Sequence, residues 1–224
     1  MKAIVSGHTH GLGAALVREL AGRGIATLGL ARGTADDLAA LYPLLVRQVR
    51  IDLSDSAALA QWLGGSALAA FLGEDAQVLL LNNAGSVQPV GPPGAQDPAE
   101  VGRTVALNVA APLMLASAVA RRGGDKRILH VSSGAGRSAY AGWSVYCACK
   151  AALDHHARAA ALDAAPGLRM CSVAPGIIDT GMQEQIRQTP DALFPARGRF
   201  VELHRNGELT DPAQCAAQLV DFLL

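Results

Sequence analysis

The chain has 224 residues, with 19 basic and 19 acidic side chains and a formal net charge of zero. This length suits one domain with a sizeable core, and the balanced charge disfavours nucleic acid and anionic membranes as partners. No uninterrupted apolar run reaches about 18 residues, so the sequence predicts no membrane span. The four cysteines form neither a CxxC pair nor a disulfide framework, which favours a reducing, cytoplasmic setting.

The first motif is a glycine-rich turn between a predicted strand and a predicted helix. Residues 2–6 form a short apolar strand that leads directly into the segment SGHTHGLG at residues 6–13. Apolar residues then recur with a helical period to Leu20, and the helix is expected to end near Gly22 or Gly24. A strand, a glycine-rich turn and a helix aim backbone N–H groups and a helix N-terminus at a pyrophosphate.

The end of the second strand indicates which dinucleotide is bound. A strand predicted at residues 26–30 is followed by Arg32, and the first acidic residue, Asp36, arrives only in the next helix. In dinucleotide folds a carboxylate here binds the 2′-OH of NAD, whereas an Arg accommodates the 2′-phosphate of NADP. The sequence therefore favours NADP. A third strand predicted at residues 46–53 carries Asp52 near its end, where it could reach the adenine.

A fourth strand is predicted at residues 76–81, an uninterrupted apolar run typical of a strand covered on both faces. It leads into Asn82-Asn83-Ala84-Gly85, whose side chains either tie adjacent strands together or contact a ligand; the residues alone leave both open. A loop rich in Pro and Gly follows over residues 86–98, and a long helix is expected to begin at Asp97 or Pro98.

Pro112 draws attention to Asn108 within that long helix. A helical proline lacks the N–H that would bond the carbonyl four residues earlier, which here belongs to Asn108. The carbonyl is therefore free to accept a hydrogen bond from water or a side chain at a kink. A plain proline kink is the alternative.

The strongest candidates for chemistry follow a fifth strand, predicted at residues 127–132. Strand side chains alternate, so only one of Ser132 and Ser133 can face a given pocket. Tyr146 and Lys150 are one helical turn apart and share a face. An ammonium about 4 Å from a phenol favours the phenolate by up to about 4 kcal/mol, or about three pK units. Such a tyrosine could exchange a proton with an alkoxide near neutral pH.

The last third of the chain predicts a helix to about Ala165, a sixth strand at residues 169–174 and a final helix. Residues 180–206 are polar and broken by Pro and Gly, which is the composition of a lid. The final helix has Asp211 as its N-cap, followed by Pro at N1 and Gln at N3.

Six strands alternating with helices predict a doubly wound, Rossmann-type parallel sheet with helices on both faces. We expect residues 1–224 to form a single dinucleotide-binding domain with its ligands outside the carboxyl ends of the strands. His155 and His156 are adjacent and do not match the i, i+4 spacing of metal ligands. We expect them at the surface or an interface, and we predict no metal site.

The whole pattern resembles the short-chain dehydrogenase/reductase family, whose motifs all occur in order. Ser6, Gly7, Gly11 and Gly13 match the family's glycine motif T-G-x3-G-x-G, with Ser in place of Thr, and residues 82–85 match its N-N-A-G motif. Asn108 matches the catalytic Asn, and Ser133 matches the Ser that precedes the catalytic Tyr by thirteen residues. Pro175, Gly176 and Thr180 match the P-G-x3-T motif.

This resemblance implies the roles of the site residues. Tyr146 would give a proton to a carbonyl oxygen that Ser133 hydrogen-bonds, while Lys150 lowers the tyrosine pKa and binds the ribose, and the Asn108 carbonyl holds a relay water. The implied cofactor-binding residues are Tyr146 and Lys150 together with Ser6, Gly7, His10, Gly11, Leu12, Gly13, Arg32, Asp52, Asn83, Ala84, Gly85, Pro175, Gly176, Ile178 and Thr180.

Within the family, the segments SSGAG, GW-x2-YC-x2-K and APGIIDTGMQ resemble sepiapterin reductases and bacterial reductases of benzil and other vicinal dicarbonyls. The implied activity is NADPH-dependent reduction of a ketone or vicinal dicarbonyl by a homodimer, with Trp143, Met182 and Gln183 lining the substrate pocket. The alternatives are an oxidative alcohol dehydrogenase, a 3-oxoacyl thioester reductase or a non-catalytic dinucleotide sensor, although a sensor has no need of the four catalytic residues.

The sequence departs from the family pattern in two places. NADPH-preferring members carry Arg or Lys where this chain has His10, and an imidazole is only partly charged at pH 7. We therefore expect NADPH affinity to weaken as the pH rises through the titration of His10. The family also continues into a further strand and a tail that helps close the substrate pocket, and this sequence stops before both.

Overall fold

The computed structural model describes residues 1–74 and 77–224. Its centre is one parallel sheet of six strands in the order β3-β2-β1-β4-β5-β6, which confirms the predicted Rossmann-type fold. The strands are β1 (Lys2–Ser6), β2 (Ala26–Ala31), β3 (Val46–Arg50), β4 (Gln77–Asn82), β5 (Asp125–Val131) and β6 (Leu168–Val173).

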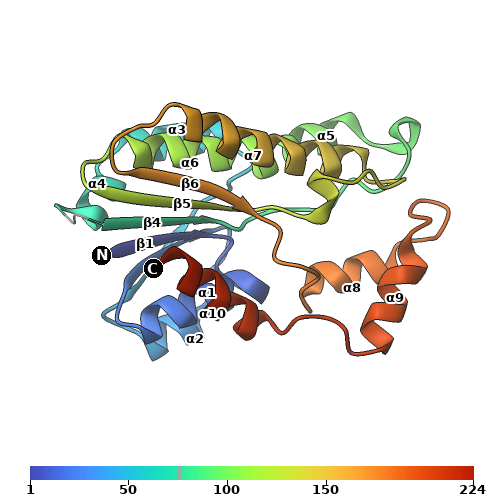
Figure 1. Ribbon diagram of the computed structural model, residues 1–224, viewed down its shortest axis with the longest axis horizontal. Coiled ribbons are helices and arrows are strands. Elements are labelled where there is room, and N and C mark those ends of the chain that lie inside the picture. Colours follow the sequence, from blue (N-terminus) through green and yellow to red (C-terminus); the bar gives the residue numbers. More distant parts are fainter. Residues whose placement is uncertain (75–76) are drawn as a thin grey trace.

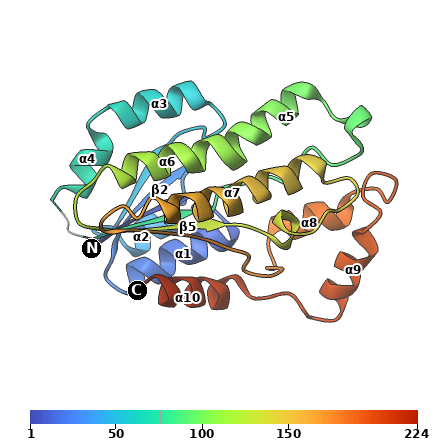
Figure 2. The same ribbon diagram turned by 45° about the horizontal axis from the view of Figure 1, so that its top comes forward.

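Helices cover both faces of this sheet (Figure 1). One face carries α1 (Gly11–Gly22), α2 (Asp36–Leu41) and α10 (Pro212–Leu223). The other carries α3 (Ser56–Gly64), α4 (Ala67–Leu72), α6 (Ala111–Ala120) and α7 (Ser144–Leu162), and Figure 2 shows α3, α6 and α7 side by side over the strands.

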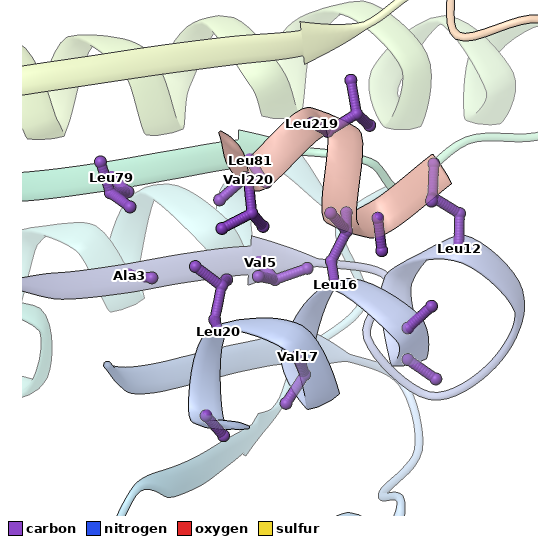
Figure 3. Close-up of a cluster of buried hydrophobic side chains, with 14 of the residues drawn as sticks. Ala3, Val5, Leu12, Leu16, Val17, Leu20, Leu79, Leu81, Leu219 and Val220 are labelled. Carbon is purple, nitrogen blue, oxygen red and sulfur yellow. The ribbon is translucent and has the colours of Figure 1, made fainter. Parts of the chain in front are cut away.

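The strands supply both halves of the core because successive side chains point to opposite faces. Ala3 and Val5 of β1 belong to the cluster beneath α1 and α10, whereas Ile4 between them belongs to the cluster beneath α3, α4 and α6. Figure 3 shows Leu16 and Leu20 of α1 on the first of these clusters, together with side chains of β4 and α10.

Several predicted boundaries were displaced. β3 ends at Arg50 rather than at residue 53, because Asp52 accepts hydrogen bonds from the N–H and hydroxyl of Ser54 in a turn before α3. β4 extends to Asn82, and residue 76, where it was predicted to begin, lies outside the described residues. α7 ends at Leu162 instead of near Ala165, because Ala164 has a φ of 46°, in the left-handed region that a right-handed helix cannot contain.

The predicted long helix consists of α5 (Pro98–Val105), a π-helical segment η2 (Ala106–Ala110) and α6. The π-helical segment ends two residues before Pro112, where the prediction placed a kink. This run, Pro98–Ala120, is long and apolar enough by length and composition to cross a membrane, which the sequence analysis did not detect. Its inner face packs on the sheet and on α3 and α7, so it is a core helix of this fold.

The segment predicted as a lid contains two helices, α8 (Gly181–Gln188) and α9 (Arg197–Arg205). Both lie beyond the carboxyl ends of the strands (Figure 1). The chain then returns to the sheet through α10, whose predicted cap is confirmed: the Asp211 carboxylate accepts hydrogen bonds from the N–H groups of Ala213 and Gln214.

Candidate functional site

A cleft of about 720 Å³ lies where the strands end, between the glycine-rich turn, the start of α7 and the lid helices. Every predicted site residue lines it except Ser6 and Asn108. A second cavity, of about 790 Å³, lies on the outer side of α1 beside Tyr42 and contains neither Tyr146 nor Lys150. The first cleft is therefore the candidate site.

The glycine-rich turn is shaped by close backbone contacts. A Cβ on Gly13 would lie 1.9 Å from the Gly7 carbonyl oxygen, and Gly7 itself has a φ of 71°. Only glycine fits either position, so β1 can turn tightly into α1. His10 is the N-cap of α1 and makes no side-chain cap hydrogen bond, so no side chain caps the first turn of α1, which lines the cleft.

Ser6 and Asn83 hold this turn to the end of β4. The Ser6 hydroxyl accepts hydrogen bonds from the N–H groups of Asn83 and Ala84, both at 3.0 Å. The Asn83 side chain donates to the carbonyls of Ser6 and Gly7 at 3.0 and 3.2 Å. Ser6 is buried and does not line the cleft, and its predicted direct contact with the cofactor stays a prediction. It positions Asn83 and Ala84, which do line the cleft.

At the predicted adenosine end, Arg32 and Asp52 are exposed and line the cleft from the ends of β2 and β3. Hydrogen bonds from Ser54 hold the pKa of the Asp52 carboxyl below its usual range, so this group is anionic at neutral pH. His10 is also exposed there, and its Nδ1 lies 3.0 Å from the Thr9 hydroxyl.

Tyr146 and Lys150 lie one turn apart on α7 and are both almost fully buried. The Lys150 Nζ is 5.7 Å from the centre of the Tyr146 ring and donates a hydrogen bond to the Val131 carbonyl at 2.7 Å. Burial raises the pKa of Tyr146 to about 12, although a hydrogen bond with Ser133 opposes this, and burial lowers the pKa of Lys150 to about 8.

The predicted lowering of the Tyr146 pKa by Lys150 is therefore wrong for this arrangement. The sequence shows the spacing of the two groups but not the burial, which disfavours the phenolate and outweighs the opposing hydrogen bond with Ser133. At neutral pH Tyr146 is a protonated phenol, ready to donate.

The two serines after β5 have different surroundings. Ser133 is half-buried and hydrogen-bonds Tyr146, in line with its selection over Ser132. Ser132 is buried, hydrogen-bonds Asp154 and points its hydroxyl at the Lys150 carbonyl, 3.5 Å away. Strand alternation alone left open whether Ser132 or Ser133 faces the site, and in the structure it is Ser133 that contacts Tyr146.

Asn108 lies in the π-helical segment η2 and is 1% exposed, behind the cleft wall. Its side chain accepts a hydrogen bond from the Ser86 N–H at 2.9 Å and donates one to the Ser86 carbonyl at 2.7 Å. These two hydrogen bonds to the Ser86 backbone hold the loop after β4 in place, a role that the sequence did not suggest. The relay through its main-chain carbonyl stays a prediction.

Several cleft residues were not predicted. Glu100 and Arg103 of α5 and Arg199 of α9 line the cleft, and Arg199 donates a hydrogen bond to the Tyr140 hydroxyl at 3.3 Å. Their positions depend on how the helices dock, and no local pattern marked them. The lid is held close to this end of the cleft at Gly142, which has a φ of 83° and where a Cβ would lie 2.1 Å from the Leu193 carbonyl oxygen.

The adjacent histidines, predicted at the surface or an interface, have different surroundings. His155 is exposed, but His156 is half-buried and its Nδ1 lies 3.1 Å from Nε2 of the fully buried His130. Within residues 1–74 and 77–224, no three His, Cys, Asp or Glu side chains gather as metal ligands.

Comparison with known proteins identifies the class. The short chain dehydrogenase family model matches residues 1–191. The chain is 33% identical to a benzil reductase ((S)-benzoin forming) of Bacillus cereus over 64% of this chain and 61% of that protein. It is 36% identical to the sepiapterin reductase of Meriones unguiculatus over 66% of this chain and 58% of that protein. The matches thus span about three fifths of the length of these relatives.

Among solved structures, a short-chain dehydrogenase/reductase from Burkholderia vietnamiensis is 54% identical, with a TM-score of 0.78, over 88% of this chain and 93% of that one. The chain therefore belongs to the short-chain dehydrogenase/reductase family. The relatives that it matches are named as reductases of benzil and of sepiapterin.

Proposed function

We propose that this protein is an NADPH-dependent carbonyl reductase that transfers a hydride to a ketone or vicinal dicarbonyl, with Tyr146 as the proton donor. The observation that carries the proposal is the buried, protonated Tyr146, bonded to Ser133 and one turn from Lys150 at the wall of the cleft. The names of the benzil and sepiapterin reductase relatives support the substrate class.

The cleft fits a dinucleotide at its glycine-rich end. The first turn of α1 lines it without a side-chain cap, and the glycine at position 13 lets this turn pack against the Gly7 carbonyl, which is the arrangement that binds a pyrophosphate. Arg32 would hold a 2′-phosphate and Asp52 the adenine, while Pro175, Gly176 and Thr180 would contact the nicotinamide end. When bound, the reduced nicotinamide supplies the hydride.

The residues of the chain then act on the carbonyl oxygen. Ser133 donates a hydrogen bond that polarises the carbonyl, and Tyr146 gives its phenolic proton to the oxygen as negative charge develops. Lys150 is largely an ammonium below a pKa of about 8 and stabilises the phenolate that Tyr146 becomes. The lid of residues 180–206 would exclude water from this end.

The test is NADPH consumption, with NADH alongside, against benzil, a sepiapterin-type pterin, a 3-oxoacyl thioester and a ketosteroid. Turnover of benzil or the pterin with NADPH supports the proposal. Turnover of the thioester alone would instead assign the protein as a 3-oxoacyl thioester reductase of the same family. Tyr146→Phe should remove almost all turnover and leave NADPH binding intact. Tyr140→Phe is the matched control because this tyrosine also lines the cleft, and substantial activity in Tyr146→Phe would refute the assignment.

We also propose that the protein works as a homodimer in the cytoplasm, with the Ala-rich helices α6 and α7 pairing with their symmetry mates. Val105, just before the π-helical segment, and Leu162, at the end of α7, are exposed apolar side chains on these runs. A sedimentation experiment that returned only the mass of one chain would contradict the dimer.

A further inference from the structure

A buried carboxylate on α7 connects three elements of the candidate site. Asp154 is 9% exposed and lies one turn after Lys150, which itself lies one turn after Tyr146. Residues four apart share a helix face, so the three side chains form one column on the buried side of α7. The proposed reaction gives Asp154 no role of its own.

The Asp154 carboxylate holds the loop that carries Ser133. Its Oδ1 accepts a hydrogen bond from the Ser172 hydroxyl of β6 at 2.6 Å, and it also hydrogen-bonds Ser132. Its Oδ2 lies 3.3 Å from Nε of Arg137. Ser133 therefore lies between two residues that contact the same carboxylate, on the loop that joins β5 to α7.

This loop packs tightly on α7 at Gly136. A Cβ there would lie 3.0 Å from Asp154 Oδ2 and 3.1 Å from the Lys150 carbonyl oxygen. Ser133 hydrogen-bonds Tyr146 between the same loop and the same helix. A shift of the loop along α7 would therefore move Ser133 relative to Tyr146, the two groups proposed to act on the carbonyl oxygen.

Asp154 also supplies negative charge beside Lys150. Burial lowers the pKa of Lys150 to about 8, and Cys149 and Asp154 oppose this. Burial raises the pKa of the Cys149 thiol, so this thiol is uncharged at neutral pH. Burial also acts on Asp154, but hydrogen bonds from Ser172 and Ser132 keep its pKa below the usual range, so it is an anion.

The other titratable groups near Lys150 do not supply such a charge. Tyr146 is a protonated phenol at neutral pH. Burial lowers the pKa of His130 in β5 to about 3, so its imidazole is neutral. Arg137, whose side chain is 60% exposed, is a cation and disfavours a second positive charge. Of these groups, Asp154 alone favours the ammonium of Lys150.

We propose that Asp154 is a positioning residue of the candidate site: its carboxylate holds the Ser133 loop against α7 and stabilises the ammonium of Lys150. This inference rests on the proposed roles of Ser133, Tyr146 and Lys150 in carbonyl reduction. Tyr146 becomes a phenolate when it gives its proton to the carbonyl oxygen, and a charged Lys150 stabilises that phenolate. Asp154 does not line the cleft, so it acts on this step through its neighbours.

Carbon-13 NMR of labelled lysines tests the charge without any turnover. The chain has three lysines, Lys2, Lys126 and Lys150, and Lys150→Met identifies the signal of the third by its loss. Asp154→Asn keeps the size of the side chain and an oxygen that accepts hydrogen bonds, but it removes the charge. The titration midpoint of Lys150 should fall by about one pH unit in this variant.

The pH profile of kcat/KM tests the consequence for the reaction. Asp154→Asn should match the wild type within about twofold at pH 6 and be about tenfold slower at pH 9, because the alkaline limb moves by about one unit. Asp154→Ala also removes the hydrogen bonds, so it should lower kcat at every pH and leave the Kd of NADPH at pH 6 unchanged. Asp163→Asn, at the exposed end of α7, is the matched control and should retain the wild-type profile.

An unchanged Lys150 midpoint in Asp154→Asn, or a loss of activity by the same factor at every pH, would overturn this role of Asp154. If that variant does not fold, Arg137→Gln at an exposed position replaces it. Removal of the cation beside Asp154 should raise the Lys150 midpoint, and an unchanged midpoint would again overturn the inference. A lowered midpoint in Asp154→Asn without wild-type turnover of any carbonyl compound would support the action of Asp154 on Lys150 and overturn the proposed reaction.

Discussion

His130 makes stability depend on pH in a window where few other groups titrate. It lies in β5, is 0% exposed, and its Nδ1 accepts a hydrogen bond from the Asn82 side-chain amide at 3.1 Å. Its Nε2 therefore carries the proton and donates to Nδ1 of His156, also at 3.1 Å. Burial above all, with the charges of His156 and Lys150, lowers the pKa of His130 from 6.5 to about 3, while Asp154 opposes this.

The sign of the effect follows from the lowered pKa. Below pH 6.5 the unfolded chain binds a proton at His130 that the folded chain does not, so acid favours unfolding until about pH 3. The contribution is fully present above pH 6.5 and falls by about 1.4 kcal/mol per pH unit below it. Over the whole interval of three and a half units the loss reaches about 5 kcal/mol.

Other groups do not obscure this window. Burial also lowers the pKa of His156, so it acts in the same direction. Asp125 and Asp154 have pKa values below the ordinary 3.8 of a carboxyl, so their contributions are lost only at lower pH. Between about pH 6 and 4.5 we expect the free energy of unfolding to fall by about 2 kcal/mol because of His130.

Urea denaturation at several pH values measures this slope. His130→Phe removes one hydrogen bond of the Asn82 amide, which still donates to the Pro112 carbonyl, and one of His156, so it lowers stability at every pH and the slopes are compared instead of the absolute values. The substitution should flatten the slope, whereas His155→Phe, at an exposed neighbouring position, should retain it. A His130→Phe slope as steep as that of the wild type would refute the reasoning.

Three further predictions concern the cleft and the last helix. Gly13→Ala should abolish NADPH binding and lower thermal stability, because its Cβ would lie 1.9 Å from the Gly7 oxygen; Gly33→Ala, with no atom within 4 Å of its added Cβ, is the control, and equal NADPH affinity in both would contradict the close contact. Asp211→Ala should cost about 1 kcal/mol of unfolding free energy, since its carboxylate caps two N–H groups of α10, and an unchanged denaturation midpoint would argue against the cap. If Arg32 holds the 2′-phosphate, Arg32→Asp should reduce the ratio of kcat/KM with NADPH to kcat/KM with NADH at least about tenfold, because one lost charged contact corresponds to about that factor. An unchanged ratio would show that Arg32 does not determine the preference for NADP.

Short-range patterns in the sequence were sufficient for the framework of this protein. Apolar runs separated by helical periods predicted six strands in a doubly wound sheet, and the sheet has that form. The turn at residues 6–13 and the cap at Asp211 were predictable because each depends on residues a few positions apart. The motif spacings that indicated the short-chain dehydrogenase/reductase family are likewise local or fixed along the chain.

Only the tertiary structure decided what the side chains at the site do. Ser6 and Asn108 match the family motifs, and their hydrogen-bond partners are backbone groups 77 and 22 residues away, which no spacing reveals. The direction of the Tyr146 pKa depends on burial by a lid and loop that come from distant parts of the chain. Desolvation and long-range hydrogen bonds exist only after these segments have packed together, so the folded chain sets the chemistry of residues that the sequence can only name.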